Sequence, residues 1–294
     1  MMAWIKGLAI GLAALALGVV ALGAVGASRW AARTRALDAR LDAARRPITP
    51  VRYDASRELA GLPAPVQRFF RAALTDGQPM VAAAAIEHRG TFNLAAEGPA
   101  RWVPFTSAQR VTMRRPGFVW DARMPMAPGL AVHVHDAYIA GEGRLQPAVL
   151  GLVSLAALRG TSPEPGGVAH GEFLRWFAEA AWYPTALLPS QGVRWSAVDE
   201  HAAEASASDG AVSATLRFRF DPATGLIAGV HAAARGRTVG KTVVMTPWEG
   251  RWSSHAEHDG MRVPLTGEVA WLTAEGPRAY WRGEVSALAY TMTR

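Results

Sequence analysis

The hydrophobic pattern starts with an unbroken apolar run at residues 7–27, GLAIGLAALALGVVALGAVGA, in which no side chain is charged. With a rise of about 1.5 Å per residue, a helix over this range crosses the roughly 30 Å hydrocarbon layer of a bilayer. We therefore predict a transmembrane helix over 7–27, preceded by an N-terminal flank at 1–6. A cleavable signal peptide is the alternative, because Lys6 gives a basic start and VGAS places small residues where a peptidase would cut.

A basic helical stalk is predicted over residues 28–48. Its residues favour helix up to Pro47, and Leu37 and Leu41 lie one turn apart. Six arginines stand against two aspartates between residues 28 and 46, and by the positive-inside bias this excess favours a cytoplasmic soluble domain. We expect these arginines to be solvated near anionic head groups rather than to form a specific lipid site.

The remaining residues, 49–294, are predicted to form one soluble α+β domain that starts with an amphipathic helix. In GLPAPVQRFFRAALTDG, apolar side chains recur at i, i+3, i+4, i+7 and i+8 from Val66 to Leu74. Pro65 suits the first turn of a helix, and Gly77 follows the last turn. The pattern predicts a helix that packs on an apolar surface.

From about Met80 the hydrophobic period changes from 3.6 to 2, which predicts strands. Short turns such as RRPG, SDGA and EHDG separate many of them, and strands joined in this way pair as an antiparallel meander because parallel pairs need long crossovers. The predicted strands are 81–93, 101–114, 117–124, 130–140, 193–199, 211–220, 226–234, 242–255, 261–273 and 278–292.

One segment, 143–189, interrupts the predicted meander. It contains the apolar stretch LQPAVLGLVSLAALRG, a loop rich in Gly and Pro, and the stretch HGEFLRWFAEAAWYPTALLP. We predict a helix for each of the two apolar stretches. Helices inserted between two halves of a sheet are expected to lie across its concave face.

Seven strings along the chain resemble an uncharacterised family of bacterial membrane-anchored proteins, a domain of unknown function. They are LPAPVQRFFRAAL, WVPFTSAQRV, FVWDARM, GEFLRWFAEAAWYPTALLP, GVRWSAVDE, TPWEGRW and YWRGEV, in this order. The resemblance covers about residues 50–294, and it implies no catalytic residue because the family has no established activity.

At the level of fold the family is similar to the LolA, LolB and LppX lipoprotein carriers. This second resemblance implies a large curved antiparallel sheet, an open half-barrel, that wraps the inserted helices behind an N-terminal transmembrane helix. It also implies an extracytoplasmic location, whereas the charge bias favours the cytoplasm, so the side of the membrane stays open. Fold alone does not fix function.

The composition excludes several classes of function. Without cysteine the chain has no disulfide, no thiolate metal site and no cysteine nucleophile. The net charge of +7 is concentrated in the stalk, so we do not expect a nucleic-acid partner. ARGRTVGKT ends like a phosphate-binding loop, but Arg235 stands where that loop needs its first glycine. We expect no cofactor.

Glu172, Arg175 and Glu179 are predicted to share one face of the second inserted helix, at i, i+3 and i+7. Arg175 can pair with both carboxylates, and a neighbouring cation lowers a carboxylate pKa, whereas a general acid needs a raised pKa. We therefore expect an ion-paired polar face. The other interpretations are a polar floor for a ligand pocket and an acid–base pair, for which Glu172, Asp121 and Asp136 are weak catalytic candidates.

The segment AVHVHDAY is the nearest approach to a metal-binding motif. His133 and His135 would share one side of a strand, but Asp136 would point to the other side, and the sequence has no HExxH pattern. We expect no metal and interpret these histidines as surface or sheet-packing residues. The pattern G-x-S-x-G, which marks one class of serine hydrolase, does not occur either.

Nine of the eleven tryptophans fall in the predicted soluble domain, most of them in predicted strands. Large aromatic side chains fill the space between a curved sheet and its helices, and together they can line an apolar cavity. The ligand-binding candidates are Trp120, Trp176, Trp195, Trp248, Arg89 and Glu172.

These features favour a protein anchored in a bacterial membrane through 7–27 that binds a lipid or another apolar ligand in a half-barrel cavity, without enzymatic activity. The same surface could instead serve a protein partner. The alternatives are a hydrolase or lyase that acts on a cell-envelope component, and a purely structural envelope module.

Overall fold

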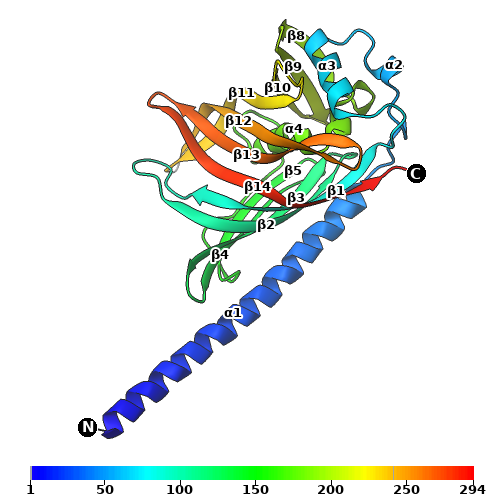
Figure 1. Ribbon diagram of the computed structural model, residues 1–294. Helices are drawn as coiled ribbons and strands as arrows, with labels where there is room; N and C mark the ends of the chain where they lie inside the picture. The colour runs from blue at the N-terminus through cyan, green and yellow to red at the C-terminus, as the bar shows by residue number, and fades with distance from the viewer. Residues whose placement is uncertain (1, 241) are drawn as a thin grey trace.

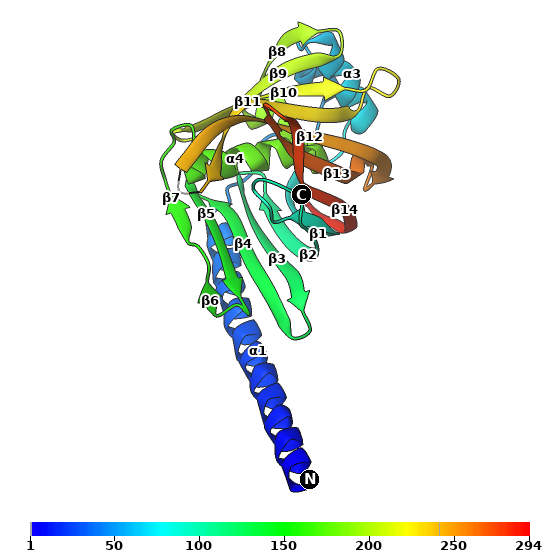
Figure 2. The same cartoon turned by 90° about the vertical axis from the view of Figure 1, so that its left-hand side faces the viewer.

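The computed structural model describes residues 2–240 and 242–294, and within α1 the side chains of residues 2–5, 7–9 and 12–17 are not described. Helix α1 (Met2–Ala44) is continuous, lies along the sheet near its C-terminal end and projects beyond it at the other end (Figures 1 and 2). Among the described residues, no helix has both the length and the apolar character needed to cross a membrane. The predicted span, 7–27, falls partly outside the described side chains.

One antiparallel sheet of 14 strands makes up most of the protein (Figure 1). Its order is β6-β5-β4-β3-β2-β1-β14-β13-β12-β11-β10-β9-β8, and β7 pairs with β5. This order confirms the predicted large antiparallel sheet, and within the described residues only the β1–β14 pair joins strands far apart in sequence. The strands are β1 (Val81–Asn93), β2 (Trp102–Thr112), β3 (Gly117–Ala127), β4 (Leu130–Ile139), β5 (Glu142–Val149), β6 (Val153–Ser154), β7 (Leu158–Gly160), β8 (Arg194–Asp199), β9 (Ala202–Asp209), β10 (Val212–Phe220), β11 (Ile227–Val239), β12 (Thr242–His258), β13 (Met261–Thr273) and β14 (Gly276–Met292).

Helix α4 (Val168–Ala178) carries the chain from β7, at one edge of the sheet, to β8 at the opposite edge, and lies across the inside of the curved sheet (Figure 2). Phe173 and Phe177 of α4 are fully buried, and Phe177 packs edge-on against Phe218 of β10. Their burial explains why the helix stays on this face, because each aromatic side chain removes a large apolar area from water. Three short 3-10 turns follow: η1 (Glu179–Trp182), η2 (Pro184–Leu187) and η3 (Pro189–Gln191).

Two further helices, α2 (Ala55–Glu58) and α3 (Ala64–Ala73), cover the end of the sheet near β8 and β9 (Figure 1). Phe69 of α3 contacts Phe220, and Phe70 contacts Trp195 edge-on. The amphipathic helix predicted after residue 61 is therefore confirmed, together with its apolar face.

The helix predicted for LQPAVLGLVSLAALRG is wrong, because most of this stretch pairs as strands β5, β6 and β7. An apolar run of this length does not separate a buried strand from a helix by period alone. In the tertiary structure, β5 packs directly against the start of α4. At Gly143 of β5, a Cβ would lie only 2.6 Å from the backbone of Val168 and Ala169. Strand β9, AAEASASD, was not predicted, because its buried apolar side chains are all alanines, which give a weak hydrophobic signal.

The C-terminal half of α1 is docked on the outer face of β3 and β4. Leu37 and Leu41 are buried there against three apolar residues of those strands. Closer to the N-terminus of α1, Trp30 stacks on His135 with ring centroids 3.8 Å apart. The indole nitrogen of Trp30 donates a hydrogen bond to Asp121 at 2.8 Å. The predicted stalk helix thus packs on β3 and β4 with the face that carries Trp30, Leu37 and Leu41, while its arginines face solvent.

Asp121 is the polar anchor of this contact. Its second carboxylate oxygen accepts a hydrogen bond from Thr34 at 2.7 Å, and Thr34 also lies 2.8 Å from His135 Nε2. Burial raises the pKa of Asp121, but the hydrogen bonds from His135, Trp30 and Thr34 outweigh it and hold that pKa below its ordinary value. Asp121 is therefore an ionised acceptor for α1.

Replacing Asp121 with alanine is expected to loosen α1 from the sheet. The change leaves the Trp30 indole without its acceptor and removes one hydrogen bond of the Thr34 hydroxyl, and a partly buried donor without a partner costs about 1–3 kcal/mol. Amide hydrogen exchange of residues 28–44 in the full chain should become faster. Asp42→Ala is the matched control, because Asp42 pairs with Arg110 at the exposed surface; equal exchange in both variants would contradict the anchor.

Candidate functional site

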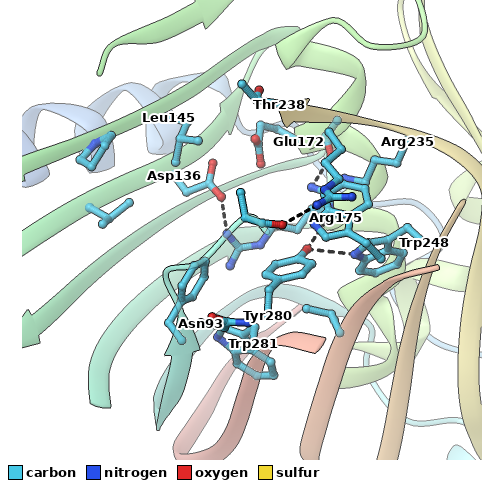
Figure 3. Close-up of a pocket in the computed structure, with 18 of the residues that line it drawn as sticks. Asn93, Asp136, Leu145, Glu172, Arg175, Arg235, Thr238, Trp248, Tyr280 and Trp281 are labelled. Carbon is cyan, nitrogen blue, oxygen red and sulfur yellow. Dashed lines mark hydrogen bonds and ion pairs between the residues drawn. The ribbon is translucent and has the colours of Figure 1, made fainter. Parts of the chain in front are cut away.

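A cavity of about 790 Å³ lies between α4 and the inner face of the sheet (Figure 3). One wall comes from β1, β3, β4 and β5 and the other from β11 to β14, so the cavity joins residues far apart in sequence. Most of its surface is apolar, and aromatic side chains form much of it, among them Trp120, Trp182, Trp248, Trp271 and Trp281. A volume of this size lies within the range of about 300–1,000 Å³ that is usual for small-molecule sites.

Arg175 of α4 holds together a buried polar cluster at this cavity. Its guanidinium lies 2.5 Å from Asp136 Oδ2 on β4 and 2.7 Å from Glu179 Oε1 on the following turn. Gln109 of β2 completes the cluster, because its amide donates to Glu179 at 2.6 Å. The i,i+4 pair between Arg175 and Glu179 was predicted, whereas the pair with Asp136 requires the packing of α4 on β4.

The Arg175 side chain is only 16 % exposed, and its guanidinium also lies over the rings of Phe118 and Trp120, at 4.8 and 4.9 Å from their centroids. Burial alone lowers the pKa of Arg175, but the carboxylates of Glu179, Asp136 and Glu172 raise it by more. Arg175 is therefore a fixed charge that is neutralised within the cluster.

Glu172 differs from its neighbour Glu179 because no cation binds it directly in the described part of the chain. It is 7 % exposed, it lies in the cavity wall, and its Oε2 atom has no hydrogen-bond partner among the described residues. Burial, followed by the negative charge of Asp136, raises the pKa of Glu172 well above its ordinary value of 4.5. The expectation of a lowered pKa is wrong for this residue, because burial outweighs the attraction of the two arginines.

Glu172 and Asp136 form a pair of neighbouring carboxyl groups, since the negative charge of Asp136 contributes to the raised pKa of Glu172. Asp136 Oδ1, like Glu172 Oε2, has no hydrogen-bond partner among the described residues. The polar face of α4, with Glu172 and Arg175, lines the cavity (Figure 3). This position is compatible with the interpretation of the face as the polar floor of a pocket. Figure 3 also shows Arg235 and Tyr280, which belong to the opposite wall of the cavity.

Arg235 is the second buried cation of the cavity, at 9 % exposure. It donates to the hydroxyl of Tyr280 at 3.3 Å and to the carbonyl of Gly171 at 3.1 Å. Its guanidinium lies 5.2 Å from the ring centroid of Trp248 and 5.8 Å from that of Trp271. The Trp248 indole also donates to Tyr280, at 2.9 Å, which fixes that hydroxyl between the two side chains.

The structure brings four of the predicted site residues to the cavity: Trp120, Trp248, Glu172 and Asp136. The other predicted residues lie elsewhere: Trp176 donates to the Thr112 carbonyl inside the core, Trp195 packs against α3, Arg89 forms an exposed ion pair with Glu284, and Asp121 binds α1 on the outer face. Strand alternation separates Trp120 from Asp121, because successive side chains point to opposite faces.

Arg235 and Tyr280 were not predicted. Along β11 the buried positions Val230 and Ala232 alternate, and this period would turn Arg235 outward. A β-bulge between Ala232 and Arg235 inserts one extra residue opposite β12 and turns the guanidinium inward. An arginine after a break in apolar alternation is the only sequence signal for it. No group of three or more metal-binding side chains occurs among the described residues.

A family described as a family of unknown function, DUF6920, matches residues 60–290. This agrees with the resemblance that the seven sequence strings indicate. No curated protein matches the sequence.

Three solved structures are similar to the chain at low scores. A domain named for outer membrane lipoprotein sorting, from Vibrio parahaemolyticus, has a TM-score of 0.41 and 12% identity over 81% of this chain and 94% of its own. A LolA superfamily protein from Nitrosomonas europaea has a TM-score of 0.32 and 8% identity over 71% of this chain and 86% of its own. A β-barrel-like protein of another domain of unknown function, from Brucella abortus, has a TM-score of 0.25 and 10% identity over 72% of this chain and 99% of its own. At TM-scores below 0.5 the similarity does not extend to a ligand or an activity.

Proposed function

We infer that this chain, which belongs to the DUF6920 family of unknown function, is a membrane-anchored protein that holds a lipid or another apolar molecule in its half-barrel cavity. The observation that carries this proposal is the cavity itself, about 790 Å³ of largely apolar space. A well-packed protein interior leaves few voids larger than a water molecule. Space of this size, with a few convergent polar groups, is typical of a ligand site.

The anchor of this proposal is the apolar part of α1. Its described side chains include exposed aliphatic residues, among them Ile10 at 70 %, Val20 at 69 % and Leu22 at 56 %. Together with the uncharged run at 7–27, this exposure favours a lipid environment for the projecting end of the helix.

Four large apolar residues at the cavity are exposed as well as cavity-lining. They are Leu94, Leu155, Leu158 and Val243. Leu155 and Leu158 follow the loop around Leu150 and Gly151, whose backbone lies against Gly26 of α1. An apolar rim on the side of the predicted anchor supports entry of the ligand from the bilayer, because exposed apolar patches mark interaction sites.

Native mass spectrometry of the full chain, released from detergent, is expected to show bound lipid. Gly171→Phe should lower its occupancy several-fold, because Gly171 lines the cavity and a Cβ there meets no atom within 4 Å. The added ring therefore occupies ligand space without a clash at its first atom. The substitution also removes a helix glycine, and phenylalanine has a somewhat higher helix propensity than glycine, so it does not disfavour α4.

Gly160→Phe is the matched control. A Cβ at Gly160 also meets no atom within 4 Å, but this residue does not line the cavity. The control should retain the lipid that Gly171→Phe loses. A wild-type chain that carries no lipid, or equal occupancy in both variants, would contradict the proposal.

The carboxyl pair of Glu172 and Asp136 favours a second candidate, a hydrolase or lyase that acts on a lipid in the cavity. A carboxyl group with a raised pKa in a cavity is a candidate general acid. The same spectra test this function, since Glu172→Gln should then accumulate a heavier, uncleaved ligand. A ligand of identical mass in both proteins counts against turnover.

A further inference from the structure

The cavity contains one buried cation that no carboxylate neutralises by contact. Arg175 has two carboxylate partners within 2.7 Å, whereas no carboxylate of the described residues lies within 4 Å of the Arg235 guanidinium. A buried charge without a counter-ion is costly, so proteins normally pair it. The charge of Arg235 is therefore available to a group that enters the cavity.

The contacts of Arg235 orient it and leave donors unused. A guanidinium has five N–H donors, and the described contacts to Tyr280 and Gly171 use two of them. The rings of Trp248 and Trp271 lie next to the guanidinium. These apolar rings keep the local dielectric constant low, which strengthens any charged hydrogen bond formed there.

The titratable neighbours do not supply the missing anion. Glu172 is the acidic group of α4, but no ion pair joins it to Arg235 in the described part of the chain, and burial raises its pKa well above the ordinary value. His170, also on α4, has a pKa lowered by burial and by Arg235, so it stays uncharged. From β4, Asp136 is bound to Arg175, and from the 3-10 turn after α4, Glu179 is bound to the same guanidinium.

We propose that Arg235, held by Tyr280, binds the anionic end of the ligand, a carboxylate or phosphate at the head of a lipid whose chain fills the apolar part of the cavity. This rests on the proposed function, because it assigns the polar end of a ligand in the same cavity. The planar fork of arginine suits both anions, since each offers two oxygens to parallel N–H groups.

The test uses the full chain in phosphatidylcholine vesicles with three photoreactive probes of one chain length: a fatty acid, an alkyl phosphate and the neutral alcohol. Crosslinking to cavity peptides is measured by mass spectrometry, at a pH where the fatty acid is ionised. The fatty acid, the alkyl phosphate or both should label the wild-type cavity roughly tenfold more than the alcohol, as one charge-assisted hydrogen bond predicts. Comparison of the two anionic probes identifies the headgroup.

Arg235→Gln should reduce anionic labelling to the level of the alcohol and leave alcohol labelling unchanged. Arg251→Gln is the matched control, because Arg251 is an exposed arginine of the neighbouring strand paired with Glu249. Arg235→Lys should keep part of the preference, since it retains the cation without the fork. This variant keeps the test decisive if Arg235→Gln does not fold.

Equal labelling by all three probes in the wild-type chain overturns the inference and leaves the proposed function intact. So does an anionic preference that survives in folded Arg235→Gln. Complete competition by inorganic phosphate would assign the site to a free anion and overturn the lipid headgroup. Absence of cavity labelling by every probe, the alcohol included, contradicts the proposed function itself.

Discussion

Arg175→Met is expected to lower the free energy of unfolding by about 3–5 kcal/mol, the cost of leaving buried charges without their partner. Asp136 and Glu179 both lose their cation, and neither is exposed enough to recover hydration, since their side chains are 12 % and 11 % exposed. Methionine keeps a long apolar side chain over Phe118 and Trp120. The loss of unfolding free energy therefore comes from the missing charge and not from a cavity left by a smaller side chain. Urea unfolding of the full chain in detergent measures it.

Arg110→Met is the matched control for this prediction. Arg110 follows Gln109 on β2 but faces outward, where it bridges Asp38 and Asp42 of α1 at 3.8 and 3.0 Å with 44 % of its side chain exposed. Exposed ion pairs contribute about 0–1 kcal/mol, so this variant should change little. A double variant with Asp136→Asn should recover part of the Arg175→Met loss. Similar losses in the two methionine variants would contradict a buried, obligatory cation.

Glu172→Gln is expected to make the folded state more stable than the wild type above about pH 5. The pKa of Glu172 in the folded protein lies well above its ordinary value of 4.5, owing to burial and to Asp136. Between these two pKa values the folded state binds more protons than the unfolded chain, so wild-type stability falls as pH rises. The slope is roughly 1.4 kcal/mol per pH unit across this window, and glutamine, which does not titrate, removes it.

The measurement is urea unfolding of both proteins from about pH 3 to about pH 8. The two proteins should agree near the lower limit, where Glu172 is protonated in both states, and diverge as pH rises. Glu204→Gln, which removes an exposed glutamate paired with Arg217, should follow the wild-type profile. Parallel profiles for Glu172→Gln and the wild type would show that Glu172 is ionised like an exposed carboxylate.

The buried cluster and Arg235 have different roles in the same cavity. Asp136 and Glu179 neutralise Arg175, so this arginine ties α4 to β4 and β2. Among the described residues, Arg235 is hydrogen-bonded only to a hydroxyl and a carbonyl, and its charge remains available. Stability and ligand recognition are therefore expected to separate: Arg175→Met affects mainly unfolding, and Arg235→Gln affects mainly the choice of ligand.

Local periodicity determined much of the fold. The strand predicted at 81–93 coincides with β1, the strand at 261–273 coincides with β13, and the helix after residue 61 contains α3. These elements have regular apolar alternation or a clear amphipathic stripe, and short turns between strands leave little choice but antiparallel pairing. The pair of Arg175 and Glu179 was also predictable, since residues four apart on a helix are neighbours.

Only the tertiary structure decided the site, because its members come from distant segments and their orientations depend on packing. Gly143 lets the start of α4 lie directly against β5, and burial of Glu172 in α4, followed by the charge of Asp136, reverses the expected direction of its pKa shift. The bulge in β11 turns Arg235 inward against the period of its strand. Sequence periodicity determines which face a regular element buries, whereas bulges and backbone approaches, set by the whole sheet, determine which charged groups meet in the cavity.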